Sequence, residues 1–136
     1  MSGAADHREA LLRKMLDGLG NLDFGKVGSL LHEGASFETP YAGPPAHGKQ
    51  AVLDMLSTAM PAFVTHMDFT VHNLYPGADP DVLISEYEST ATLIGGGRYA
   101  NRYINVMRVK DGKILLFREY FNPVAIAEAQ AQNSNP

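Results

Sequence analysis

Two adjoining segments near the end of the chain carry side chains that could exchange protons or hold a ligand. Residues 98–123 read RYANRYINVMRVKDGKILLFREYFNP, a pattern that predicts two strands joined by a turn. Because side chains alternate between faces along a strand, the first strand places Tyr99, Asn101, Tyr103 and Asn105 on one face. The matching set on the returning strand is Leu115, Phe117, Glu119 and Phe121. A hairpin that only packed a core would not need these phenol, amide and carboxyl groups, so the segment is a candidate site.

The turn of this hairpin is predicted at Asp111 and Gly112. Asp-Gly between apolar runs is a strong hairpin signal, because a type I′ turn needs positive φ at both central positions. The opposite face of the hairpin comprises Arg98, Arg102, Ile104, Val106, Arg108, Ile114, Leu116, Arg118 and Tyr120. Neither face is purely apolar, so alternation alone does not decide which of them is inside.

Other polar residues are weaker candidates for acid–base or metal chemistry. Glu86 and Glu88 share a strand face, but such pairs are more often solvated partners of arginines on a neighbouring strand. Tyr87 lies on the opposite face and could line a cavity, whereas His47 lies in a loop where simple exposure is the plainer interpretation. The His, Asp and Glu residues lack metal-ligand spacing, and Gly95–Gly97 precedes a strand instead of opening a helix. We therefore expect no metal and no cofactor.

The composition favours one globular domain with a sizeable core. The chain has 136 residues, of which 45% are hydrophobic and 19% charged. A formal net charge of −4 without a basic run argues against nucleic acid or an anionic membrane as a partner. The absence of cysteine excludes disulfides and thiolate metal sites. Because the sequence shows neither a secretory signal nor an apolar run of membrane-spanning length, we expect a cytoplasmic protein.

The elements that position the candidate residues are predicted from apolar periodicity and turn signals. Helices are expected at residues 5–19, from Asp23 to a stop at Gly34, and at 49–60. Strands are expected at 35–39, 67–75, 82–93 and along both arms of the hairpin, and residues 40–48 form a loop. Residues 1–5 and 127–136 are expected to be flexible ends. This order predicts a single α+β domain, residues 1–136, in which a curved antiparallel sheet wraps around the N-terminal helices as a cone with an internal pocket.

The same order of elements, with the hairpin pattern YxNRYINVxRVxDGKIxxxREYFNP, resembles the SnoaL-like branch of the nuclear transport factor 2-like superfamily. The resemblance covers nearly the whole chain, and the hairpin is most similar to phenazine biosynthesis A/B-type proteins and SnoaL-like polyketide cyclases. It implies a pocket lined by Tyr99, Asn101, Tyr103, Asn105, Phe117, Glu119 and Phe121. It also implies that Glu119, with its pKa raised by an apolar wall, is the catalytic general acid or base.

Other reactions of the superfamily need residues that this chain lacks at the matching positions. The three catalytic positions of the ketosteroid isomerases match Met15, Thr39 and Asn105, and neither Met nor Thr can shuttle a proton at neutral pH. No aspartate flanks Arg98 or Arg102 as epoxide hydrolases would require, no histidine pair of the scytalone dehydratase kind is evident, and the hairpin supplies no inward aspartate of the cyclase kind. The candidate substrate contacts outside the hairpin are Met15, Thr39 and Tyr41.

Two functions of different classes follow. In the first, the protein is a cofactor-independent isomerase, cyclase or lyase that uses Glu119 to move a proton on a hydrophobic cyclic metabolite. In the second, the same cavity binds a small ligand without turnover, and a third possibility is a filled pocket in an interaction module. An arginine bonded to Glu119 in a closed interior would favour a structural role, whereas an open apolar pocket beside the tyrosines would favour catalysis.

The outward-facing apolar residues of the hairpin indicate an interface. An apolar patch on the back of a sheet is typical of a contact surface, and relatives of this fold commonly dimerise there. We therefore expect a homodimer through the outer face of the sheet.

Overall fold

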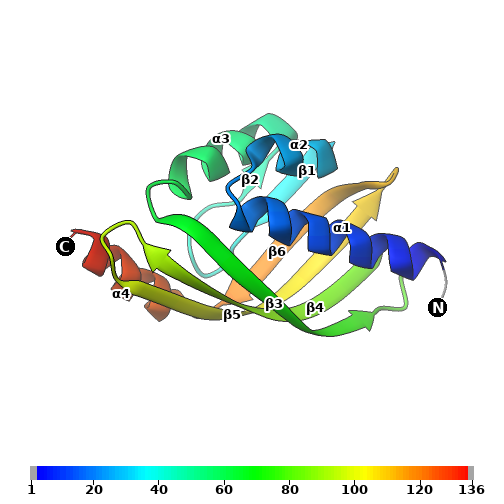
Figure 1. Cartoon of the computed structure of the whole chain (residues 1–136). Coiled ribbons are helices and arrows are strands. Elements are labelled where there is room, and N and C mark those ends of the chain that lie inside the picture. The colour runs from blue at the N-terminus through cyan, green and yellow to red at the C-terminus, as the bar shows by residue number, and fades with distance from the viewer. Residues whose placement is uncertain (1–2, 135–136) are drawn as a thin grey trace.

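The computed structural model describes residues 3–134, and within that range it has four helices and one curved sheet of six strands (Figure 1). The helices are α1 (Gly3–Gly20), α2 (Phe24–Leu30), α3 (Lys49–Ala59) and α4 (Pro123–Ser134). The strands are β1 (Leu31–Glu38), β2 (Ala46–His47), β3 (Val64–Pro76), β4 (Val82–Leu93), β5 (Arg98–Lys110) and β6 (Lys113–Phe121). The predicted α+β class is confirmed. None of the described helices is long and apolar enough to cross a membrane.

The sheet is mixed, with the strand order β2-β1-β6-β5-β4-β3. The meander from β3 to β6 is antiparallel throughout, as predicted. The prediction of a wholly antiparallel sheet is wrong at β1, which pairs in parallel with β6. The meander leaves its last strand with a free edge, and β1 satisfies the backbone groups of that edge from a distant part of the sequence.

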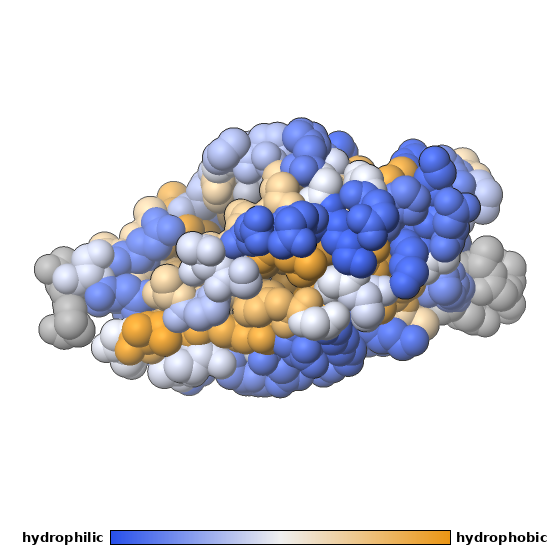
Figure 2. Space-filling view, turned by 90° about the horizontal axis from the view of Figure 1, so that it is seen from above, coloured by the Kyte–Doolittle hydropathy of each residue, from blue (hydrophilic) through white to orange (hydrophobic). Residues whose placement is uncertain are grey.

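The N-terminal helices cover one face of the sheet, which we call the inner face (Figure 1). The first helix buries five large apolar residues: Leu11, Leu12, Met15, Leu16 and Leu19. Asp23, the predicted start of the second helix, caps α2: its side chain accepts a hydrogen bond from the backbone N–H of Lys26 at 3.1 Å. Seen from above, the molecule is largely hydrophilic, with a band of hydrophobic residues between the hydrophilic areas (Figure 2).

The hairpin turn forms as predicted, but β6 contains an irregularity that alternation could not reveal. Asp111 and Gly112 have φ angles of 52° and 74°. Val109 pairs with Ile114 and Arg108 with Leu116, so Leu115 is an extra residue, a β-bulge, on β6. The bulge changes the phase of the alternation. The placement of Ile114 on the outer face is therefore wrong, because its side chain is fully buried.

Three further boundaries differ from the prediction. The second helix ends at Leu30 and β1 begins directly at Leu31, so Gly34 lies inside a strand instead of stopping a helix. The expected loop 40–48 contains the short strand β2. The expected flexible end from residue 127 forms most of α4 as far as Ser134, whereas residues 1–2 and 135–136 lie outside the described range.

Helix α4 is held to the rest of the domain by specific contacts. Ala129 is buried in a second apolar cluster that includes Tyr99 and Leu93. Asn133 accepts a hydrogen bond from the N–H of Gly95 at 2.8 Å and donates one to the carbonyl of Phe63 at 3.2 Å. Small alanines and one amide therefore attach a segment whose composition alone indicated fraying.

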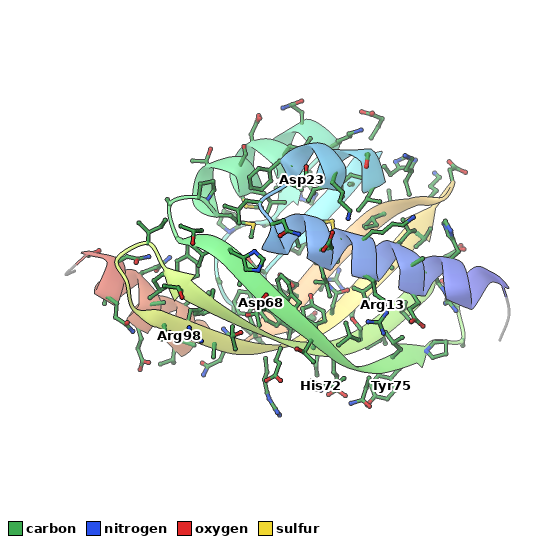
Figure 3. The ribbon with its side chains drawn as sticks, in the orientation of Figure 1. Arg13, Asp23, Asp68, His72, Tyr75 and Arg98 are labelled. Carbon is green, nitrogen blue, oxygen red and sulfur yellow. The ribbon has the colours of Figure 1, made fainter. Side chains whose placement is uncertain are left out.

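The outer face of the sheet carries apolar side chains framed by ion pairs. We define the outer apolar patch as Ile84, Ile104, Val106, Leu116 and Tyr120, all of them half-buried or exposed and placed in adjacent rows of β4, β5 and β6. The pair Arg108–Asp79 (3.0 Å) lies at its margin, whereas Arg118, which pairs with Glu38 (3.3 Å), lies between Leu116 and Tyr120 on β6. His72 and Tyr75 of β3 also point away from the helices (Figure 3). An apolar centre with a polar rim is the usual anatomy of a protein interface.

We propose that this patch forms the homodimer interface. Replacing Ile104 with Asp would place a charge at the centre of the interface and is expected to convert a dimer into a monomer, because an unpaired charge resists desolvation. Size-exclusion chromatography with light scattering measures the mass. Ile94→Asp is the matched control. Ile94 is 51% exposed and Ile104 is 46% exposed, so the two changes are comparable, and Ile94 lies outside the patch, at the turn that follows β4. A monomeric wild-type protein at micromolar concentration would remove the proposal.

Candidate functional site

A row of polar side chains crosses three strands on the inner face. Ser85 of β4 pairs with Asn105 of β5, and Asn105 pairs with Glu119 of β6. Ser85 and Asn105 are fully buried, and Glu119 is 7% exposed. We call these three residues the polar row. Their inward orientation follows from strand alternation and register, and it places a carboxyl, an amide and a hydroxyl inside the core.

The neighbouring rows on the same face are apolar or aromatic. On one side Leu83, Met107 and Phe117 are cross-strand neighbours, and all three are buried. On the other side the neighbours are Tyr87, Tyr103 and Phe121. The rings of Tyr87 and Tyr103 stack with centroids 5.0 Å apart. The polar row is thus enclosed by hydrophobic and aromatic walls.

Glu119 is the ionisable centre of the site. Burial raises the pKa of its carboxyl from 4.5 to about 7, and a hydrogen bond donated by the hydroxyl of Tyr87 opposes part of that rise. Within the described residues its carboxylate makes no ion pair, so the arginine-bonded arrangement that would favour a structural role is not observed. A carboxyl that titrates close to neutrality can give or take a proton under physiological conditions.

The tyrosines around Glu119 form a second polar chain. The hydroxyl of Tyr103 is 2.7 Å from that of Ser89 and 3.2 Å from that of Tyr99. Burial, reinforced by the charge of Glu119, raises the pKa of Tyr87, Tyr103 and Tyr99. These phenols therefore remain protonated and act as hydrogen-bond donors or acceptors, not as bases.

Asn101 and Asn105 lie four residues apart on β5 and have different surroundings. The amide of Asn101 donates to Tyr99 at 2.8 Å and to the carbonyl of Asn122 at 3.0 Å, and its oxygen accepts from the N–H groups of Asn122 and Arg102. These bonds join β5 to the end of β6. Neither amide atom of Asn105, nor the hydroxyl of Ser85, makes a hydrogen bond of ordinary geometry with any described residue. Asn105 is close enough to Tyr87 to lower the pKa of that phenol, although this is the weakest of the influences on the pKa.

Only some of the remaining residues that the sequence suggested for the site lie near Glu119 or in the core beside it. Phe117 stacks on Phe37 at 5.5 Å in the core, and Met15 is fully buried in the same cluster. Thr39 is half-buried at the end of β1. Tyr41 is 63% exposed and packs edge-on against Tyr120 of the outer face, at 5.9 Å. Phe121 contacts Tyr103 edge-on at 5.6 Å.

The acidic pair and the histidines of the outer face make local contacts. Glu88 lies opposite Arg102 across the ladder, as predicted, whereas Glu86 lies opposite Ile104. The hydrogen bonds of both run to β3, from Glu88 to His72 at 2.9 Å and from Tyr75 to Glu86 at 2.6 Å. His47 is bonded to Ser36 at 2.9 Å. The residue that sequence reasoning undervalued is Tyr87. Strand alternation placed Tyr87 on the face of β4 away from Glu86 and Glu88. It could not reveal the hydrogen bond to Glu119, which joins residues 32 apart in sequence.

Two of the surface grooves adjoin the aromatic side of this interior, and Glu119 lines neither of them. The larger, about 630 Å³, extends from Tyr41, Ile104 and Tyr120 of the outer face to Tyr87, Tyr103 and Phe121 of the aromatic row. The smaller, about 330 Å³, lies between α1 and β3, with Arg13 and Asp68 at its sides (Figure 3). Its lining includes Phe69, whose ring lies 5.8 Å from Tyr87. Entry from this groove to the polar row would require movement of Phe69.

The raised pKa of Glu119 predicts that stability falls as pH rises. The folded-state pKa of about 7 exceeds the unfolded value of 4.5, so the folded state binds the extra proton between these pH values. The protonated carboxyl makes its whole contribution to the free energy of unfolding below about pH 4.5, and this contribution is lost by about pH 7. The pKa shift corresponds to roughly 3 kcal/mol. Urea unfolding of wild type and Glu119→Gln from pH 4.5 to 8 should show this slope only in the wild type. Glu88→Gln should keep it, and parallel profiles in all three proteins would contradict the assignment.

Tyr87→Phe tests the hydrogen bond to Glu119. Removing the phenol removes the interaction that favours the ionised carboxylate, so the pKa of Glu119 should rise further. A titration of the carboxyl carbon by NMR measures this pKa directly. Tyr75→Phe provides the control, because Tyr75 bonds to Glu86 on the outer face. A lower or unchanged pKa in Tyr87→Phe would show that the bond does not stabilise the carboxylate.

Comparisons with known proteins agree with the architecture. The family model described as SnoaL-like domain matches residues 12–117. An uncharacterised PhzA/B-like protein of Pseudomonas aeruginosa is 36% identical over 104 residues, covering 74% of this chain and 73% of the relative. The uncharacterised protein YesE of Bacillus subtilis is 33% identical over 123 residues, with 87% and 83% covered.

Solved structures give the same result. A structure named as a putative isomerase from Bacillus subtilis superposes with a TM-score of 0.86 at 28% identity, covering 96% of this chain and 97% of the other. Structures of an epoxide hydrolase, a ketosteroid isomerase and a putative SnoaL-like polyketide cyclase share the fold at 20% identity or less. These more distant similarities concern the fold alone. Because the family model matches most of this chain, the chain belongs to the SnoaL-like family.

Proposed function

We propose that the protein is a cofactor-independent enzyme of the isomerase, cyclase or lyase type that acts on a small hydrophobic cyclic metabolite. Glu119 is its general acid or base. The observation that carries the proposal is a buried carboxyl with a pKa of about 7 that is bonded to a tyrosine instead of a cation. Solved structures of the same fold include isomerases, epoxide hydrolases and cyclases, so the architecture is compatible with such chemistry.

The surroundings of Glu119 suit proton transfer to and from an apolar molecule. The walls supplied by Met107, Phe117 and Tyr87 exclude water, which strengthens every electrostatic interaction inside the site. Ionised at slightly alkaline pH, Glu119 can abstract a proton, and in its neutral form it can return one. The phenols of Tyr103 and Tyr99 stay neutral and orient the ligand without competing for the proton.

Ligand binding without turnover is the second candidate function. Its support is the larger groove, which is lined by Tyr87, Tyr103 and Phe121 but not by Glu119. A binder would use the same walls and polar row, but it would not need Glu119 to change its protonation state. Turnover therefore separates the two functions.

The test begins with the ligand. Native mass spectrometry of the purified protein would identify a retained molecule, and its relatives, together with a panel of cyclic ketones, would then be screened for turnover. Glu119→Gln is expected to lower kcat by roughly 10²- to 10⁴-fold, the usual contribution of a general acid or base. Glu88→Gln serves as the control, because Glu88 lies on the outer face. Equal turnover in Glu119→Gln would exclude Glu119 from the mechanism, and binding without any turnover would favour the second function.

A further inference from the structure

Helix α4 lies at the end of the sheet where β5 begins (Figure 1). Its residue Ala129 is buried in the second apolar cluster, together with Ala91 of β4 and Tyr99 of β5. Tyr99 begins the chain of hydroxyl contacts that runs through Tyr103 to Ser89. A movement of α4 away from the sheet would therefore uncover the tyrosine end of the interior.

The middle of α4 is attached to this end of the interior by small or partly exposed side chains. Ala129 is its one buried residue among those that the structure describes, and Ala125 and Ile126 pack against the cluster while partly exposed. The other three helices each bury leucines in the core. Because apolar burial stabilises in proportion to the area removed from water, separating α4 from the domain costs less than separating any other helix.

The junction between β6 and α4 is fixed on the strand side. Asn101 holds the backbone of Asn122 at both of its polar groups, because it accepts a bond from the N–H and donates one to the carbonyl, each at 3.0 Å. The side chain of Asn122 accepts the N–H of Val124 at 3.0 Å and so starts the helix. A groove of about 440 Å³, lined in part by Asn101 and Asn122, leaves space beside this junction. Rotation about the backbone that follows Asn122 would move the helix as a unit.

The far end of α4 is fastened by Asn133. The amide oxygen of this residue accepts the N–H of Gly95 at 2.8 Å, and its NH₂ group donates to the carbonyl of Phe63 at 3.2 Å. These two groups belong to different connections, one after β4 and the other before β3. Asn133 therefore joins three segments of the chain, and its release would break two hydrogen bonds of ordinary strength.

We propose that α4 is a hinged lid over the tyrosine end of the interior, with its hinge after Asn122 and its latch at Asn133, and that small apolar molecules enter and leave when the latch opens. The inference rests on the proposed function in that it supplies an entrance to the same interior. Such an entrance is needed because Glu119 lines neither of the two grooves that adjoin the interior.

The groove between α1 and β3 is the competing entrance. Phe69 would have to leave its contact with Tyr87 before a molecule could pass from this groove. The helix and the strand are also in close backbone contact at one end of the groove, since a Cβ atom added at Gly20 would overlap the carbonyl oxygen of Met67. α1 cannot move aside without exposing its buried leucines, so α4 is the element that opens at the lower cost.

Introduced thiols measure access beneath the lid, because the chain contains no cysteine of its own. Ala91→Cys places a thiol under α4, and Ala35→Cys places one in the main core cluster. Iodoacetamide is a small neutral molecule, and mass spectrometry gives its rate of reaction with each thiol. Asn133→Ala removes both latch bonds and should raise the rate in Ala91→Cys by roughly ten- to a hundredfold, while the rate in Ala35→Cys stays unchanged.

The control for the latch is Ser134→Ala. Ser134 donates to the carbonyl of Gln130 within the same helix at 3.1 Å, so its loss should leave both rates unchanged. Equal acceleration of the two thiols by Asn133→Ala would mean that Asn133 supports the whole fold, and no acceleration would mean that it is not a latch. Acceleration by Phe69→Ala but not by Asn133→Ala would place the entrance at the groove beside α1. Each of these three results overturns the proposal.

Hydrogen exchange provides a second measurement that needs no introduced thiol. In Asn133→Ala the backbone amides of α4 should exchange faster than in the wild type by the same factor as the labelling rate, whereas those of α1 should not change. Exchange that rises equally in α1 and α4 would contradict a lid, since it would report unfolding of the domain as a whole.

The lid and the proposed function fail in different ways. Turnover that persists in Glu119→Gln, together with labelling that depends on Asn133, would reject the proton transfer and leave the lid intact. Turnover that is lost in Glu119→Gln, together with labelling that does not respond to Asn133→Ala, would reject the lid alone.

Discussion

The carboxyl of Glu119 is held away from water, and the rest of the interior is arranged around that fact. An ionised carboxylate inside a core is unfavourable. Here the hydroxyl of Tyr87 stabilises it by donating a hydrogen bond, in place of a cation. The result is a group whose two protonation states are close in free energy near neutral pH. Helices over the inner face and β1 on the edge of β6 are the elements that keep solvent out.

Local features of the fold could be predicted from the sequence because they depend on neighbours in the chain. The bounds of β4, the turn at Asp111 and Gly112, the third helix and the cap at Asp23 all follow from short-range patterns. The parallel pairing of β1 with β6 could not be read in this way, since it joins strands about 80 residues apart. Helix α4 was missed because its stability comes from contacts of Ala129 and Asn133 with other elements, not from its own composition.

The sequence predicted which face of the sheet carries the candidate site, but not which of its side chains are hydrogen-bonded. Alternation and family resemblance together placed Tyr99, Tyr103, Asn105 and Glu119 on the inner face, where the structure has them buried. The sequence contains nothing that distinguishes Asn101 from Asn105. Asn101 is hydrogen-bonded to Asn122 and Tyr99, whereas the amide of Asn105 makes no hydrogen bond of ordinary geometry with any described residue, because the strand end that satisfies Asn101 does not reach it. Differences of this kind arise only in three dimensions.

The bulge at Leu115 has a consequence for how this family can vary. Ile114 and Phe117 are both buried although they are an odd number of positions apart, which a regular strand does not allow. Loss of the one extra residue would reverse the faces of either the turn or the strand end, and in the second case Glu119 would lie on the exposed side of the sheet. Insertions and deletions between the turn and Phe117 are thus a single-step route for related chains to lose or acquire an internal carboxyl while keeping the same fold.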